Sequence, residues 1–118
     1  GTDGAIVWKN TSLPFITPQG AASSPILHED KLILCCDGTD KQFLAALDKH
    51  SGKVLWKQDR QHLERVDRGF FKMAYSTPLV HEVDGIAQLV ATSAEYTWML
   101  GSWMLRLYCS ARASRTLR

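Results

Sequence analysis

The sequence predicts an all-β protein built from antiparallel sheets that repeat along the chain. Short apolar runs alternate with turn signals, two phrases occur twice in the same order, and helical periodicity competes only weakly, over residues 59–72. The chain has 118 residues, 45% of them hydrophobic and 22% charged, which is typical of a folded domain. Its net charge of +2 is too small to indicate a nucleic-acid partner.

Two phrases of the sequence recur with a period near fifty residues. Residues 4–8 (GAIVW) recur as residues 52–56 (GKVLW), 48 positions later. Residues 23–27 (SSPIL) recur as residues 76–80 (STPLV), 53 positions later. Such spacing, with short strands between turns, is typical of the four-stranded blades of a β-propeller. The predicted fold is therefore a partial β-propeller of about two antiparallel blades.

Each copy of the Ser-Pro phrase opens a predicted hairpin. Pro25 and Pro78 stand at strand starts, where a missing N–H does least harm. The first hairpin turns at residues 28–31, and the second at Asp84 and Gly85, because glycine tolerates the positive φ of a tight hairpin turn. The hairpin strands are expected at residues 25–27, 32–36, 79–82 and 86–91.

The other two strands of the first blade are predicted from an apolar run and its return. Residues 43–47 (FLAAL) are typical of a buried strand, and residues 53–56 return after a turn. In that turn, Asp48 can accept hydrogen bonds from backbone N–H groups, and Gly52 can take the left-handed position of a bulge. One four-stranded blade is therefore expected between residues 22 and 56.

Residues 46–56 (ALDKHSGKVLW) resemble the tryptophan-docking motif of PQQ-like β-propeller repeats, Ala-x-Asp-x-x-Thr/Ser-Gly-Lys-x-x-Trp. Residues 3–8 resemble the end of a preceding copy, and the resemblance covers about residues 3–95. In that family the tryptophan packs between neighbouring blades, against the alanine and the glycine of the motif. The resemblance implies a structural docking role for Trp8, Ala46, Asp48, Ser51, Gly52 and Trp56.

The family covers several functions, which the fold alone does not separate. Docking motifs without cofactor ligands favour a non-catalytic binding or scaffold propeller of a bacterial envelope or secreted protein, periplasmic or secreted in location. One alternative is a fragment of a quinoprotein alcohol dehydrogenase, with pyrroloquinoline quinone and calcium as cofactors. Another is a sensor propeller attached to a Ser/Thr kinase. Expected partners are a protein or small ligand at the propeller loops, and further blades of the parent chain.

Cys35, Cys36 and Asp37 motivate the quinoprotein alternative. Quinoprotein dehydrogenases resemble this sequence in carrying an adjacent cysteine pair, followed by Asp, near the quinone. Neighbouring residues on a strand point to opposite faces, however, so an ordinary buried strand accounts for the same residues. The chain has three cysteines, an odd number that does not indicate a disulfide framework.

We predict no catalytic constellation and no metal site. The sequence has no nucleophile elbow, no carboxylates at useful spacing and no Cys–His pair with an orienting group. The longest loop, residues 59–75, mixes both charges, and Arg68 and Lys72 are its candidates for binding an anionic partner. The histidines share no ligand spacing and are expected in turns or a loop: His28, His50, His62 and His81.

The composition changes abruptly near Glu95. All 12 acidic residues lie at or before it, and the only charged residues after it are arginines. A repeat region over residues 1–95 is therefore expected to give way to an atypical basic tail over residues 96–118, which lacks a third docking motif. Three origins for this tail stay open: a frameshifted or artificial end, a divergent capping strand, and a basic interfacial segment that touches a membrane. Its apolar stretch is too short to span a bilayer.

Overall fold

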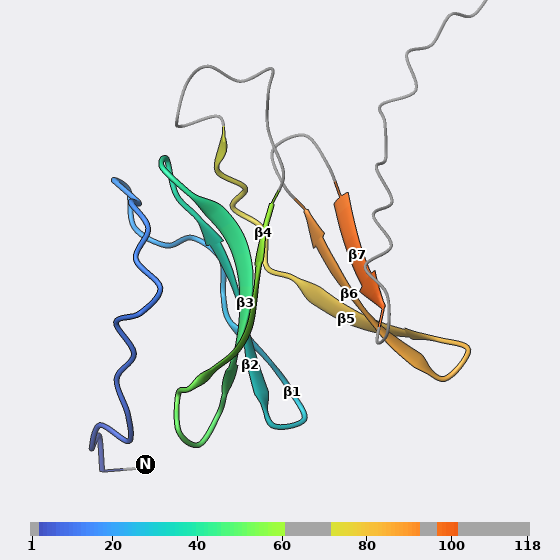
Figure 1. Ribbon diagram of the computed structural model, residues 1–118, viewed down its shortest axis with the longest axis horizontal. Coiled ribbons are helices and arrows are strands. Elements are labelled where there is room, and N and C mark those ends of the chain that lie inside the picture. Colours follow the sequence, from blue (N-terminus) through green and yellow to red (C-terminus); the bar gives the residue numbers. More distant parts are fainter. Residues whose placement is uncertain (1–2, 61–71, 93–96, 102–118) are drawn as a thin grey trace, which may run out of the picture.

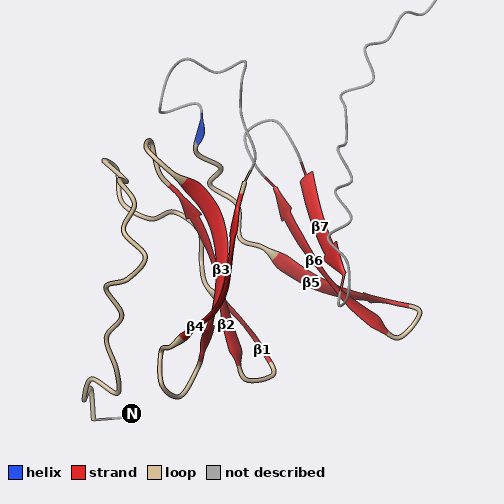
Figure 2. Ribbon diagram, viewed as in Figure 1, coloured by secondary structure: helices blue, strands red, loops and turns tan. Residues whose placement is uncertain are grey.

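The computed structural model describes residues 3–60, 72–92 and 97–101, and these residues form two antiparallel sheets (Figure 1, Figure 2). The first sheet has the strand order β1-β2-β3-β4, and the second has the order β5-β6-β7. The strands are β1 Ile26–His28, β2 Lys31–Asp37, β3 Gln42–Asp48, β4 Val54–Asp59, β5 Leu79–Val83, β6 Ile86–Thr92 and β7 Thr97–Gly101. The all-β prediction is confirmed, and within the described ranges both sheets are open.

The first sheet has the four antiparallel strands that the sequence predicts between residues 22 and 56. Each strand pairs with the next one along the chain, and the fourth strand runs on to Asp59, beyond the predicted end at Trp56. β3 is the most deeply buried strand, with Phe43, Leu44 and Ala45 at most 1% exposed. Such complete burial explains why this segment reads as a continuous apolar run instead of an alternating one.

The turns follow the sequence signals. Asp84 and Gly85 have φ angles of 52° and 74°, as the two central residues of a type I′ hairpin turn require. Gly52 also takes a left-handed conformation, with φ of 69°. The Gly52 N–H donates to Asp48 O and the Asp48 N–H donates to Lys53 O, both at 2.8 Å, so Gly52 occupies the left-handed position of a bulge, as predicted. A second irregularity lies in β4, where Ala46 faces Trp56 while the next residue of β3 faces Val54.

The first sheet is buried on both faces. One face carries a cluster of Cys36, Phe43, Ala45 and Leu47, against which Trp8, Leu13 and Phe15 of the N-terminal segment pack. The other face carries Ile33, Cys35, Leu44 and Ala46, which share a cluster with Leu89 and Ala91 of the second sheet. The described chain is therefore layered as N-terminal segment, first sheet and second sheet (Figure 1).

The second sheet extends past the boundary expected after Glu95. β7 pairs with β6 from Gly101 opposite Gln88 to Thr97 opposite Thr92. Residues 102–118, the rest of the expected tail, lie outside the described residues. No helix in the described ranges has the length and apolar character needed to cross a bilayer.

Candidate functional site

A buried ion pair between Asp37 and Arg60 lies where β2 and β4 end. Arg60 Nη1 is 2.9 Å from Asp37 Oδ2, and the two side chains are only 3% and 4% exposed. Both strands run antiparallel to β3, so they are parallel to each other and end at the same edge of the sheet. Arg60 continues β4 by one residue, since its backbone N–H donates to Gln42 O at 2.9 Å. The sheet topology therefore brings the two side chains together.

Arg60 also connects the first sheet to the second. Its Nη1 donates to Thr92 O, at the end of β6, at 2.9 Å. Its Nη2 lies 3.1 Å from Cys35 Sγ, and Asp37 Oδ2 accepts a further bond from the Ala74 N–H at 3.3 Å. The guanidinium group of Arg60, which follows β4, thus binds the ends of β2 and β6 and so connects strands of both sheets. We call Arg60, together with Asp37, Cys35, Ala74 and Thr92, the Arg60 clip.

Burial determines how the groups of the Arg60 clip ionise. It raises the pKa of Asp37 to about 6, although the charge of Arg60 and the Ala74 N–H act in the opposite direction. Burial also raises the pKa of the Cys35 thiol, and that of the Cys36 thiol to about 12. Because the thiolate is the reactive form of cysteine, both residues are poor nucleophiles at neutral pH. The cluster is suited to holding sheets together.

The cysteine pair does not form a common surface for a quinone. Cys35 faces the cluster shared with the second sheet, whereas Cys36 faces the cluster beneath the N-terminal segment. A planar ring could contact one thiol or the other, but not both from one side. The carboxylate of Asp37 is already bound by Arg60. Within the described ranges, no three His, Cys, Asp or Glu side chains converge as metal ligands.

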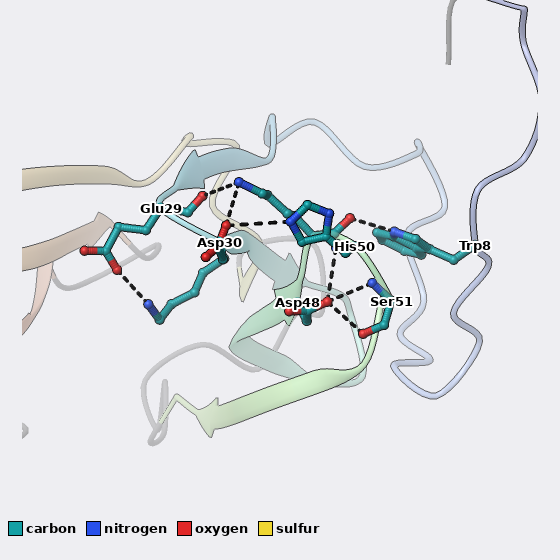
Figure 3. Close-up of polar contacts among 8 residues, drawn as sticks. Trp8, Glu29, Asp30, Asp48, His50 and Ser51 are labelled. Carbon is teal, nitrogen blue, oxygen red and sulfur yellow. Dashed lines mark hydrogen bonds and ion pairs between the residues drawn. The ribbon is translucent and has the colours of Figure 1, made fainter.

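Trp8 lies over the turn that joins β3 to β4 (Figure 3). Asp48 Oδ1 organises this turn by accepting hydrogen bonds from the Ser51 N–H at 2.7 Å, the Ser51 hydroxyl at 2.8 Å and the His50 N–H at 3.1 Å. The Trp8 indole N–H donates to Lys49 O at 2.8 Å. A Cβ atom on Gly52 would be 2.3 Å from Trp8 Cε3, so only glycine leaves room for the ring.

Trp56 lies on the opposite side of the first sheet from Trp8. It packs, half-buried, against the cluster shared by the two sheets, and Ala46 is its partner in the register of β3 and β4. Trp8 packs instead against the cluster that contains Cys36 and Phe43. The two tryptophans of the repeated phrase therefore contact successive layers of the structure.

The turn beneath Trp8 is also bound to the turn between β1 and β2 (Figure 3). Lys49 donates its backbone N–H to Asp30 O at 2.9 Å, and its Nζ lies 2.7 Å from Asp30 Oδ1. His50 Nε2 is 3.7 Å from the same carboxylate oxygen. The hydrogen bond from Lys49 lowers the pKa of Asp30, and the Ser51 hydroxyl lowers that of Asp48. These groups are exposed, so they shape the turn more than they stabilise the fold.

The remaining predicted site residues are described only in part. Lys72 is half-buried beside the buried Met73, whereas Arg68 lies outside the described residues. His50 lies in a turn, as expected, whereas His28 is the last residue of β1 and His81 lies within β5. His62 is also outside the described residues. The sequence pattern places Arg60 in a mixed-charge loop and gives no sign that its side chain is buried. The available signal was Asp37, an acidic residue that ends an apolar strand and so needs a buried partner.

Comparison with known proteins assigns no function to the Arg60 clip or to the contact between Trp8 and Gly52. No protein-family model, curated protein sequence or solved structure matches the chain.

Proposed function

We propose that the chain forms consecutive blades of a PQQ-like β-propeller and acts as a binding scaffold without chemistry of its own, in a bacterial envelope or secreted protein. The observation that carries the proposal is the contact between Trp8 and Gly52. Trp8 closes one copy of the Gly-x-apolar-apolar-Trp phrase, and Gly52 opens the next. A tryptophan of one repeat that docks on the glycine of the following repeat is the arrangement that the family resemblance implies.

The Arg60 clip supports a scaffold role. It uses the buried charges of Asp37 and Arg60 to hold β2, β4 and β6 together, and leaves Cys35 and Cys36 as buried neutral thiols. The first sheet is covered on both faces, and packed sheets of this kind can hold loops in a fixed arrangement for a protein or small ligand. The half-buried Lys72 lies on the segment that leads into the second sheet, at the kind of position where such a partner would bind.

The quinoprotein alternative gains no support from the geometry. Its only motivation is the sequence Cys35, Cys36 and Asp37, whose thiols face opposite sides of the sheet and whose carboxylate is paired with Arg60. A kinase-attached sensor would use the same scaffold and would differ in the domains joined to it.

The proposal is tested on the complete gene product by adding pyrroloquinoline quinone and calcium. We expect no change in quinone absorbance on titration and no oxidation of primary alcohols with an artificial electron acceptor. Turnover that requires both additions would overturn the scaffold role. Electron microscopy of the same protein tests the architecture: blades around a central channel are expected, and a stack of sheets without a channel would overturn the propeller.

A further inference from the structure

Residues 6–11 form a segment that is fixed in place yet belongs to neither sheet. Trp8 is held on Gly52 and Lys49, and Asn10 Nδ2 donates to Gly52 O at 2.6 Å. Among the described residues, however, the backbone groups of this segment make no backbone hydrogen bond. Ile6 and Val7 are 82% and 72% exposed. Backbone groups in such a row are a template for pairing with another strand.

The internal repeat shows which strand this segment corresponds to. Residues 4–8 repeat residues 52–56 at a distance of 48 positions, so residues 6–11 correspond to β4. β4 is the fourth strand of the first sheet and pairs antiparallel with β3. Residues 6–11 therefore have the sequence of a fourth strand without a third strand beside them in the described structure.

The second sheet, in contrast, has no fourth strand among the described residues. The hairpin of β5 and β6 corresponds to the hairpin of β1 and β2. β7 corresponds to β3, because each begins five residues after the end of its hairpin: β3 at Gln42 after Asp37, and β7 at Thr97 after Thr92. No described strand pairs with the outer edge of β7. The second sheet thus has the places of strands one to three filled and the fourth place open to a strand of the β4 kind.

We propose that residues 6–11 of one copy of this chain add to β7 of a second copy as the fourth, antiparallel strand of its second sheet. The register of β3 and β4, carried over by the repeat, places Trp8 opposite Gly101, Lys9 opposite Leu100, Asn10 opposite Met99 and Thr11 opposite Trp98. Main-chain hydrogen bonds supply the affinity in this mode of recognition. Pairing would also cover the exposed Ile6 and Val7.

The donor must come from a second copy because the first sheet stands in the way. Trp8 holds residues 6–11 against the face that carries Cys36 and Phe43, while the second sheet packs against the other face (Figure 1). The segment therefore cannot reach β7 of its own chain while Trp8 stays on Gly52. In the paired state, the second sheet of one copy would be followed by the first sheet of the next, as the two sheets follow each other within one chain.

Strand donation of this kind is a head-to-tail contact, which closes into a ring or grows into a filament. This step rests on the proposed propeller scaffold, whose blades follow one another in the same head-to-tail order. The pairing itself needs only the repeat and the open edge.

The experiment is sedimentation of the 118-residue chain over a range of concentrations. We expect reversible association of the native sequence. The double variant Ile6→Pro/Lys9→Pro removes an N–H from each side of the segment but keeps Trp8 and Asn10, and should weaken association at least about tenfold. Ala22→Pro, in an exposed coil outside the segment, is the matched control and should associate like the native chain.

A second measurement identifies the pairing partners and does not depend on the proline variants. A spin label is placed on Lys9→Cys in a Cys109→Ser background and mixed with ¹⁵N-labelled chain, so that only contacts between copies broaden signals. We expect selective broadening at Met99 and Leu100. Strand donation would be overturned by any of three results. These are a native chain that stays monomeric, an equal effect of Ala22→Pro and of Ile6→Pro/Lys9→Pro on association, or broadening of signals other than those of Met99 and Leu100. A monomer whose β7 pairs within its own chain would leave the scaffold proposal standing, whereas quinone-dependent turnover would overturn only the scaffold.

Discussion

Trp8 lies so close to Gly52 that a Cβ atom at the glycine would be 2.3 Å from Cε3 of the indole ring. The contact joins the end of one copy of the repeated phrase to the start of the next. It also coincides with a left-handed backbone, since Gly52 has φ of 69°. Gly52 is therefore required for two separable reasons, backbone conformation and space, and a matched pair of substitutions can separate them.

Gly52→Ala should destabilise the chain more than Gly85→Ala does. Both glycines have positive φ, so each alanine bears the left-handed penalty of about 1–2 kcal/mol. Only at Gly52 does the new methyl group meet a neighbour, whereas nothing lies within 4 Å at Gly85. We expect an additional loss of about 2 kcal/mol at Gly52, measured by urea unfolding followed by circular dichroism. Equal losses at the two glycines would show that Trp8 does not depend on this space.

Removal of Arg60 should be among the most damaging single substitutions. Arg60→Met keeps an unbranched stem but leaves the Asp37 carboxylate buried without its partner and frees Thr92 O. Loss of one member of a buried pair costs about 3 kcal/mol or more. Lys57→Met is the control, because the ion pair of Lys57 with Asp59 is largely exposed and should contribute less than about 1 kcal/mol. Similar unfolding midpoints in urea for the two variants would contradict the structural role of the Arg60 clip.

The raised pKa of Asp37 predicts an unusual pH dependence of stability. Its pKa is about 6 in the folded chain, against an ordinary value of 3.8, so the folded state binds the proton more tightly. The stabilisation from Asp37 is therefore complete below pH 3.8 and is lost as the pH rises through about 6. The two-unit difference corresponds to roughly 3 kcal/mol.

The contribution of Asp37 to the pH dependence of stability is isolated by comparing the native chain with Asp37→Asn from pH 4.5 to 7.5. The exposed carboxylates of Asp30 and Asp48 have lowered pKa values, so their contribution to stability is lost on acidification, in the opposite direction to that of Asp37. Because both chains contain these carboxylates, their effect cancels in the comparison. The free energy of unfolding of the native chain should fall relative to that of the variant as the pH rises. A constant difference between the two chains across this range would show that Asp37 does not titrate there.

Much of the first sheet and the first hairpin of the second sheet could be predicted because their signals are local. The turn from Asp48 to Gly52 needs only neighbouring residues, and the type I′ turn at Asp84 and Gly85 is set by two of them. The opposite orientation of Cys35 and Cys36 follows from the two-residue period of a strand. In these places, side-chain chemistry within a few residues decides the backbone.

The Arg60 clip and β7 could not be predicted in the same way. Arg60 meets Asp37 only because β2 and β4 end at the same edge, which depends on the assembled sheet. β7 lacks the docking pattern of the repeat, and its strand pairing with β6 is made by the backbone, which any side chains allow. Strand formation in such a segment reflects its neighbour more than its own sequence.

The two buried cysteines should resist alkylation in the folded chain. Cys35 is 9% exposed and Cys36 is 2% exposed, and a pKa raised from 9.0 to about 12 lowers the thiolate fraction of Cys36 at pH 8 roughly 1,000-fold. In a Cys109→Ser background, iodoacetamide labelling counted by mass spectrometry should therefore modify neither residue in buffer and both in urea. Rapid labelling of one residue in buffer would mean that a reactive thiol is accessible. That outcome would contradict the buried arrangement and restore the case for a cofactor at the cysteine pair.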